Sequence, residues 1–172
     1  MSHAVIQFEA YLDSLQTTPA GLVTVDLPVI NHITQELKGA GIAGAIDMPI
    51  NGLTQAMGVT LNFRTVTEHS RKLEAPKSHY LQLYAAIQDL DQATGAFVVK
   101  KHLMELRIIP KNITPGKLDP GTTQDRSCEY EVLYLKESIN DVAIREIDKL
   151  GGVFAIDGIN YYADINKALG RG

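Results

Sequence analysis

The sequence predicts a mainly β fold with one long helix, a projecting arm and a short helix near the carboxyl end. Three observations carry this prediction. Runs in which apolar and polar residues alternate recur along the chain, which is typical of strands with one buried face. Segment 74–91 shows the three- and four-residue apolar spacing of a long amphipathic helix. The stretch 36–58 fits neither pattern and is the expected arm.

Length and composition limit the possible classes of protein. A chain of 172 residues is expected to form one domain and to bury roughly 70 % of its unfolded surface. Its net charge of −4 argues against wholesale binding of nucleic-acid backbone, which needs clustered Lys and Arg. The single cysteine, Cys128, excludes an intramolecular disulfide and is expected to be a small buried side chain. Because Lys38 is the first basic residue and no apolar run is long enough for a membrane span, we expect no targeting segment and no stable membrane association.

The stretch 36–58 is apolar but is interrupted by five glycines and one proline. Helical spacing and strand alternation are both lost there, yet the stretch is too apolar for a solvated linker. We therefore expect an arm that packs against another copy of the protein. The residues expected to make this inter-subunit contact are Gly39, Gly41, Ile42, Gly44, Ile46, Met48, Ile50 and Leu53.

The arm also matches a dinucleotide-binding fingerprint by its letters, with Gly39, Gly41 and Gly44 at the required spacing. That fingerprint needs a buried strand before it and a helix after it, because the first helical amides bind the phosphate. Residues 34–38 are mostly polar, and Pro49 would stop a helix that followed the glycines. The match therefore does not predict a nucleotide site.

Two alternating runs flank the arm. Segments 29–38 and 59–67 each have an apolar and a polar face, so the arm is expected to be the tip of a long hairpin. A strand is expected over 22–27, and segment 1–8 is a candidate first strand before the turn-rich segment 11–21. The polar faces of the two flanking runs carry His32, Thr34, Glu36, Lys38, Thr60, Asn62 and Arg64.

The helix expected over 74–91 has one apolar stripe, formed by Tyr80, Leu83, Tyr84, Ile87 and Leu90. A lone amphipathic helix among strands normally covers an open end of a sheet or barrel. We therefore expect these tyrosines in the core rather than around a ligand.

Further strands are expected over 96–109, 127–136 and 142–150. The 127–136 strand places Cys128, Tyr130, Val132 and Tyr134 on one face. The loop expected over 110–126 is long, and loops of this length usually have a function or are disordered. A tight turn at Asp157-Gly158 and a helix over 161–169 complete the pattern.

No catalytic, cofactor or metal site is expected. The five histidines lack metal-ligand spacing, and there is no nucleophile elbow and no phosphate-cradling lysine loop. The charged run 145–149 fits a solvated or interfacial strand edge better than an acid–base pair. These patterns argue against an enzyme.

Three blocks of sequence, in order along nearly the whole chain, carry a resemblance to a known family. The first runs from Val25 to Pro28 and continues over 36–44, the second is the Leu-Tyr-Ala-Ala run over 83–86, and the third extends from Glu129 to Gly170. In order and spacing they resemble the major tail tube protein of contractile-tailed bacteriophages and phage-tail-like particles. The chain departs from the family at its amino end, where it lacks the basic residues that often precede the first strand.

The resemblance implies a small β-sandwich or partial barrel with a flanking helix and a long projecting hairpin. It also implies that six copies form a ring whose sheets join into an inner barrel, and that rings stack into a hollow tube inside a contractile sheath. The implied partners are other copies of the chain and the tail sheath, baseplate and tail-terminator proteins, with DNA only as passing cargo. The implied location is the virion tail or a phage-tail-like particle, assembled in the bacterial host cytoplasm. If the strands beside the arm line the tube, their polar faces line its lumen.

Two alternatives stay open at this point. One is a type VI secretion tube protein with the same fold. The other is a small-ligand-binding β-barrel that uses the glycine-rich arm as a lid. A tube protein forms rings or filaments, whereas a ligand-binding barrel stays monomeric. The sequence does not distinguish a phage from a headless particle.

Overall fold

Most of the chain folds into one broad antiparallel sheet. The computed structural model describes residues 4–13 and 22–171, so the expectations for residues 1–3 and 14–21 lie outside the described residues. The strands lie in the order β1 (Ala4–Leu12), β6 (His79–Leu90), β7 (Phe97–Thr114), β8 (Arg126–Ile139), β9 (Val142–Asp148), β10 (Val153–Ile156) and β11 (Ile159–Asn160). Successive side chains of a strand point to opposite faces, so alternation gives the long strands one face for the core.

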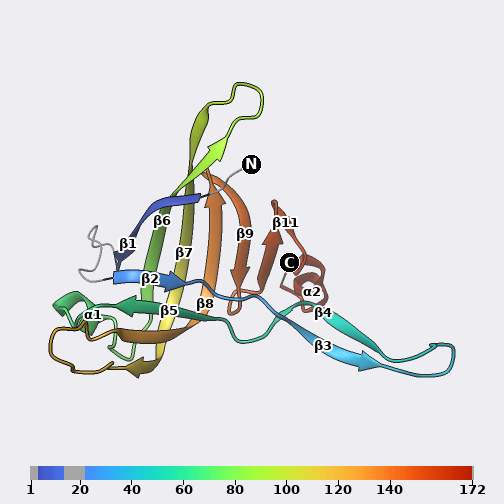
Figure 1. The fold of residues 1–172 in the computed structure, drawn as a ribbon. Helices are drawn as coiled ribbons and strands as arrows, with labels where there is room; N and C mark the ends of the chain where they lie inside the picture. The colour runs from blue at the N-terminus through green and yellow to red at the C-terminus, as the bar shows by residue number, and fades with distance from the viewer. Residues whose placement is uncertain (1–3, 14–21, 172) are drawn as a thin grey trace.

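A shorter layer crosses in front of the lower half of the broad sheet (Figure 1). In this layer β2 (Leu22–Asp26) pairs with β5 (Gly58–Phe63), and β5 pairs with residues 126–131 of β8. From Tyr134 onward β8 pairs with β9 in the broad sheet. Because β8 belongs to both layers, it closes one side of the sandwich, as in a partial barrel. The predicted fold class, a mainly β sandwich or partial barrel, is therefore confirmed.

The hydrophobic core lies between the two layers. Val59, Leu61 and Phe63 of β5 belong to one buried cluster with Leu81 of β6 and Leu106 of β7, and none of these side chains is more than 1 % exposed. Burying a side chain of this size stabilises the fold by about 1.5–3 kcal/mol. Cys128 is also buried in this cluster, as its sequence context indicates.

The long helix expected over 74–91 is wrong, because this segment contains β6. The strand pairs with β1 on one side and with β7 on the other. The apolar residues of the segment satisfy helical spacing, but His79, Leu81 and Leu83 also alternate, and these three are buried. Both neighbouring strands hydrogen-bond to its backbone, and this tertiary pairing decides the strand conformation over the local helical pattern.

The described residues contain two short helices. α1 (Glu68–Lys72) starts with a capping box, in which the Thr67 hydroxyl accepts from the Ser70 N–H at 3.2 Å and the Ser70 hydroxyl accepts from the Thr67 N–H at 2.9 Å. α2 (Ala163–Ala168) lies within the predicted helix 161–169. The predicted Asp157-Gly158 turn joins β10 to β11, with both residues at positive φ.

Two differences from the expected strands come from local irregularities. A bulge shifts the β7–β8 register between Arg107 and Ile108, so Leu135 enters the core and Tyr134 turns to the opposite face from Val132. The grouping of Tyr134 with Val132 on one face is therefore wrong. β7 also continues through Pro110 to Thr114, which shortens the expected 110–126 loop to residues 115–125.

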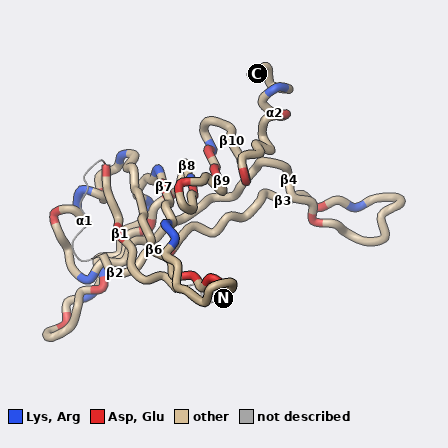
Figure 2. The backbone as a smooth tube through the Cα atoms, turned by 90° about the horizontal axis from the view of Figure 1, so that it is seen from above, with Lys and Arg blue, Asp and Glu red and all other residues tan. Residues whose placement is uncertain are grey.

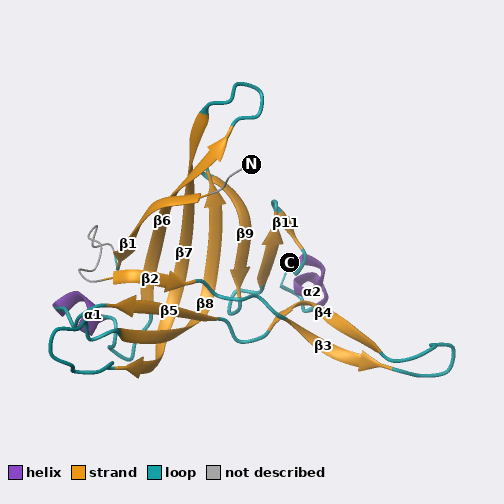
Figure 3. Cartoon of the chain, in the orientation of Figure 1, coloured by secondary structure: helices purple, strands orange, loops and turns teal. Residues whose placement is uncertain are grey.

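The arm is a separate two-stranded sheet that projects from the sandwich (Figure 3). It consists of β3 (His32–Leu37) and β4 (Ile46–Thr54). Since β2 leads into β3 and β4 leads into β5, the arm extends the β2–β5 pair, as predicted for the tip of a long hairpin. At the junction the Gln55 N–H donates to the Asn31 carbonyl oxygen at 2.8 Å. The sequence pattern does not indicate the strand β4.

Candidate assembly interface

The arm has one apolar and one polar face. The β3–β4 register pairs Leu37 with Ile46 and Gln35 with Met48 on one side, and Glu36 with Asp47 on the other. Directly opposite residues of an antiparallel pair share a face, so Leu37, Ile46 and Met48 lie on the same side of the arm. Every residue from 31 to 49 is exposed, and the exposed fractions of these three apolar side chains are 38–47 %. A projecting apolar face of this kind is typical of a protein contact surface.

The residues predicted for the inter-subunit contact spread over the whole length of the arm. The turn at its tip contains Gly39, Gly41, Ile42 and Gly44, with Gly41 and Gly44 at positive φ. Ile46 and Met48 lie along β4, while Ile50 and Leu53 lie closer to the sandwich. Ile50 is half-buried, so the arm is least exposed near its root. A strand and not a helix follows the glycines, which agrees with the rejection of a nucleotide site.

The shorter layer has four strands, in the order β2, β5, β8 and the end of β7. Within the described residues, no strand pairs with the outer edge of β2 or with the outer edge of residues 109–114 of β7. All three pairings in this layer are antiparallel, so β2 and β7 run in opposite directions at its two edges. β5 is paired on both sides, with β2 and with β8, so it offers no free edge.

The outer face of this layer is covered by small polar side chains. The register aligns Thr24, Asn62, Ser127 and Thr114 in one cross-strand row. It aligns Asp26, Thr60, Glu129 and Asn112 in the next. The Asn62 side-chain amide donates to the Thr24 hydroxyl and to the Asp26 carboxylate, both at 3.0 Å. The charged side chains in these two rows are Asp26 and Glu129, and neither row contains an aromatic side chain.

The seven candidate lumen residues divide between two places. Thr60 and Asn62 lie on the outer face of the short layer, and Arg64 follows β5 as an exposed residue. The other four lie on or beside β3 in the arm: His32, Thr34, Glu36 and Lys38. Lys38 forms an ion pair with Glu36 at 3.1 Å, and the His32 ring lies 5.4 Å from the Phe154 ring. The structure of the single chain does not bring all seven together on one surface.

The outer face of the broad sheet is a hydrogen-bonded polar surface. The Tyr80 hydroxyl donates to the Glu105 carboxylate, and the Tyr134 hydroxyl donates to Glu146 at 3.2 Å. Burial, and then the neighbouring carboxylate, raises the pKa of Tyr80 and of Tyr134 to about 12. Figure 2 shows acidic and basic residues interspersed along the described chain.

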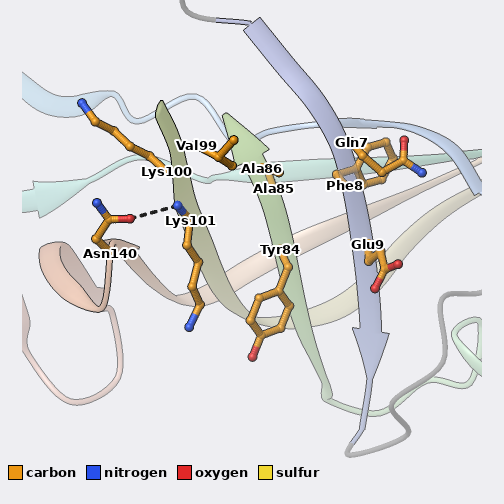
Figure 4. Close-up of a pocket in the computed structure, with 10 residues that line it drawn as sticks. All are labelled: Gln7, Phe8, Glu9, Tyr84, Ala85, Ala86, Val99, Lys100, Lys101 and Asn140. Carbon is orange, nitrogen blue, oxygen red and sulfur yellow. Dashed lines mark hydrogen bonds between the residues drawn. The ribbon is translucent and has the colours of Figure 1, made fainter. Parts of the chain in front are cut away.

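A shallow pocket of about 430 Å³ lies over β1, β6 and β7 (Figure 4). Two of its residues are lysines, and both already have acidic partners: Lys100 pairs with Asp89 at 2.5 Å and Lys101 with Asp141 at 2.6 Å. A second, apolar pocket of about 160 Å³ opens between the layers. The arm projects away from β1 and β6 (Figure 1) and covers neither of these two pockets.

Across residues 4–13 and 22–171, no group of three or more His, Cys, Asp or Glu side chains is placed to hold a metal ion. In the same part of the chain, no helix has the length and apolar character needed to span a membrane.

Comparisons with known proteins agree with one another. The profile of the phage tail tube protein FII family matches residues 2–170. The major tail tube protein of Serratia phage KSP20 is 27 % identical over 167 residues, which cover 96 % of this chain and 94 % of that protein.

Three solved structures share the fold. A chain of the PVC sheath–tube complex, from an extracellular contractile injection system, matches with a TM-score of 0.55 and 13 % identity, covering 78 % of this chain and 90 % of that one. A chain of the PVC sheath/tube terminator structure matches with a TM-score of 0.54 and 12 % identity, covering 78 % of this chain and 95 % of that one. A chain of the anti-feeding prophage baseplate matches with a TM-score of 0.52 and 9 % identity, covering 82 % of this chain and 99 % of that one. At these identities the similarity concerns the fold alone.

Proposed function

The chain belongs to the phage tail tube protein FII family, and we propose that it assembles into hexameric rings that stack as the inner tube of a contractile tail. Proteins of this family are structural components and not enzymes. The tube so formed is the conduit that the contracting tail drives through the target cell envelope. In a phage particle, DNA passes through it.

The observation that carries the ring is the pair of edges on the four-stranded layer with which no described strand pairs. Unpaired strand edges associate readily with other strands, and proteins normally cover or pair them. An even number of antiparallel strands leaves the two edges running in opposite directions. When copies are placed head to tail, β2 of one copy therefore meets residues 109–114 of the next copy in antiparallel orientation. Such a repeated contact between different edges closes into a ring when the rotation permits.

The arm supports the stacking of rings. In Figure 1 the arm leaves the sandwich at the end of the β2–β5 pair, on the side where those two strands lead into it. Strands of a closed barrel run along its axis with a tilt. An arm that prolongs two such strands is directed out of its own ring toward the adjacent one, where its apolar face gains a partner.

The two polar rows of the four-stranded layer are the proposed wall of the lumen. This proposal keeps Thr60 and Asn62 as lumen residues and places Arg64 at their margin. The polar side of the arm, with Thr34 and Glu36, extends the wall toward the next ring. The wall carries Asp26 and Glu129, and Lys111 forms an ion pair with Glu129 at 3.6 Å. Because it has no excess of positive charge, such a wall neutralises few phosphates and lets DNA pass without holding it.

The proposed partners are other copies of the chain and the tail sheath, baseplate and tail-terminator proteins. Support comes from the fold similarity to chains of a sheath–tube complex, a terminator and a baseplate. The proposed location is the tail of a virion or phage-tail-like particle, assembled in the host cytoplasm. The family match favours a phage-type tail tube over the type VI secretion alternative.

Negative-stain electron microscopy of the purified chain, with light scattering over a range of concentrations, tests the proposal. We expect six-fold rings and stacked tubes whose amount rises with concentration. A chain that remains monomeric at the highest concentration, with no rings or tubes, contradicts it. Monomers that bind a small molecule in the pocket over β1, β6 and β7 favour the ligand-binding alternative.

A further inference from the structure

The aromatic ring of Tyr162 fills the space between the root of the arm and the body of the protein. A Cβ atom at Gly52 of β4 would lie 2.5 Å from Cδ2 of Tyr162, and a Cβ atom at Gly152 would lie 3.0 Å from Cε1 on the other edge of the ring. The distance at Gly52 is shorter than real Cβ atoms show, and the distance at Gly152 is tighter than nearly all real Cβ contacts. Both glycines also have positive φ, a conformation that other residues adopt with strain. The ring therefore needs glycine on both sides.

Hydrogen bonds hold the backbone around this ring in place. The Asn51 side-chain amide donates to the Tyr161 carbonyl oxygen at 3.2 Å, which ties β4 to the C-terminal segment. The Asn160 side-chain oxygen accepts from the N–H groups of Phe154 at 3.2 Å and of Tyr162 at 3.0 Å. The Asn166 side-chain amide donates to the Gly152 carbonyl oxygen at 2.9 Å. Tyr162 is thus fixed relative to β10, and β4 is fixed relative to Tyr162.

The other strand of the arm is held on the same side of the molecule. The His32 ring at the start of β3 lies 5.4 Å from the Phe154 ring of β10, at an interplanar angle of 58°. Figure 1 shows α2 beside the root of the arm, while the rest of the arm extends away from the body. From residue 31 through the tip of the arm to residue 49, every residue is exposed. The contacts that determine the direction of the arm are therefore concentrated at its root.

We propose that Tyr162 is a positioning residue that holds the arm in its stacking direction before another ring is met. This inference rests on the proposed function, because it assigns to the C-terminal segment control over the contact between rings. Without the aromatic side chain of Tyr162, the chain between β2 and β3 and between β4 and β5 acts as a hinge, and the arm samples many directions. Docking must then restrict that motion, which weakens the contact, whereas an arm already held in one direction docks with less loss of entropy.

Spin labels measure this effect in the monomer. One label is placed at the arm tip through Ala43→Cys and one on the exposed β6–β7 connection through Gln92→Cys; buried Cys128 is retained. In dilute protein we expect a narrow distance distribution for the parent chain and a clearly broader one for Tyr162→Ala. Tyr162→Phe keeps the ring and should restore the narrow distribution. Tyr161→Ala is the matched control, because Tyr161 contributes its backbone carbonyl, and not its ring, to the Asn51 contact.

Electron microscopy of the same variants separates positioning from a general loss of folding. Tyr162→Ala should still form rings through the strand edges but should stack them about tenfold less at a given concentration. Gly52→Ala displaces the aromatic ring of Tyr162 from the side of β4 and leaves the sequence of the C-terminal segment unchanged. It should give the same phenotype.

A narrow distribution in Tyr162→Ala, or stacking equal to that of Tyr161→Ala, overturns the inference. Equal loss of rings and of tubes in Tyr162→Ala also overturns it, because that result indicates a purely structural role. Failure of the parent chain to form rings contradicts the proposed function instead, and the monomer distances still decide whether Tyr162 directs the arm.

Discussion

Single residues join the end of β1 to the start of β6. The Asp13 carboxylate accepts from the Tyr80 N–H at 2.8 Å and lies 3.1 Å from Nδ1 of buried His79, whose Nε2 lies 3.0 Å from the Ala75 carbonyl oxygen. Burial alone would raise the pKa of the Asp13 carboxyl. The Tyr80 N–H and the His79 ring outweigh it, so the pKa is lowered.

Replacing this carboxylate should therefore have an effect that depends on pH. Asp13→Asn is expected to cost about 1 kcal/mol of unfolding free energy at pH 7, a low value because the carboxyl is partly solvated. Because the pKa of this carboxyl is lower in the folded than in the unfolded state, its charge stabilises the fold fully at pH values above the ordinary aspartate pKa. This stabilisation is lost as the pH falls through the folded-state pKa. Urea unfolding at several pH values should show the difference from the parent shrinking below about pH 4. A difference that is constant with pH contradicts the role of the charge.

The central core residue Leu61 should be much less tolerant than an exposed leucine. Its side chain is fully buried between the layers, whereas Leu118 in the 115–125 loop is 91 % exposed. Leu61→Ala should lower the unfolding free energy by about 2–5 kcal/mol, because it removes buried surface and leaves a cavity. Leu118→Ala is the matched control and should change it by less than about 0.5 kcal/mol. Similar costs for the two variants, measured by urea unfolding, contradict the assigned core.

Among the elements, β6 and the arm depend on different kinds of contact. β6 is enclosed by two strands of its own chain. The arm pairs only with itself and with the contacts at its root, and its apolar face is left without a partner in the described residues. Chain segments with few buried contacts exchange their amide hydrogens early.

Hydrogen exchange should therefore differ along the arm. In the monomer we expect fast exchange over 38–49 and slower exchange over 50–54, where the Tyr162 ring and the Asn51 hydrogen bond hold β4. In assembled tubes the whole arm should be protected, because docking orders it. The shortened loop 115–125 is a weaker candidate for the same change. Equal protection of 38–49 in monomer and tube contradicts the assignment of the arm as an inter-subunit contact.

For the whole molecule, the decisive feature is the pair of edges on one four-stranded layer that no strand among residues 4–13 and 22–171 covers. Intersubunit disulfides test their pairing. With Thr24→Cys in β2 and Asn112→Cys in β7, oxidation should give a ladder of covalent oligomers that ends at the proposed ring size of six. A second pair, Thr24→Cys with Thr114→Cys, tests a β2–β7 register shifted by two residues. Gln7→Cys at the exposed edge of β1, combined with Asn112→Cys, is the matched control. Rings without a ladder from either β2–β7 pair contradict this edge contact.

The charge of the proposed lumen wall determines how the tube interacts with DNA. We expect parent tubes to bind double-stranded DNA weakly and only at low salt, because the wall neutralises few phosphates. Asp26→Lys should make the tubes retain DNA with a steep salt dependence, whereas Leu118→Lys on the exposed loop should not. Parent tubes that hold DNA at physiological salt contradict the conduit. A tube structure that places Thr60 and Asn62 on the outer wall contradicts only the strand assignment.

Local sequence patterns determined the features that depend on near neighbours. Alternation predicted the strands over 22–27 and 96–109, since one buried face requires a period of two. In the second of these strands Met104, Leu106 and Ile108 are buried. The Asp157-Gly158 pair predicted its turn because both residues tolerate positive φ. Interrupted apolar spacing over 36–58 predicted an arm outside the body, and the order and spacing of three blocks predicted the tail tube family.

The tertiary structure decided what depends on distant segments. Residues 79–90 satisfy both a helical and a strand period, and pairing with β1 and β7 selects the strand. The bulge that exchanges Tyr134 for Leu135 in the core exists only in the register between β7 and β8. Which strand edges stay free follows from pairings between separate strands, such as that of Asn62 with Ser127. Which side chains contact the root of the arm follows from contacts such as the one between Asn51 and Tyr161, 110 positions apart. Spacing within one segment carries no information about such contacts, because they form only when the layers pack.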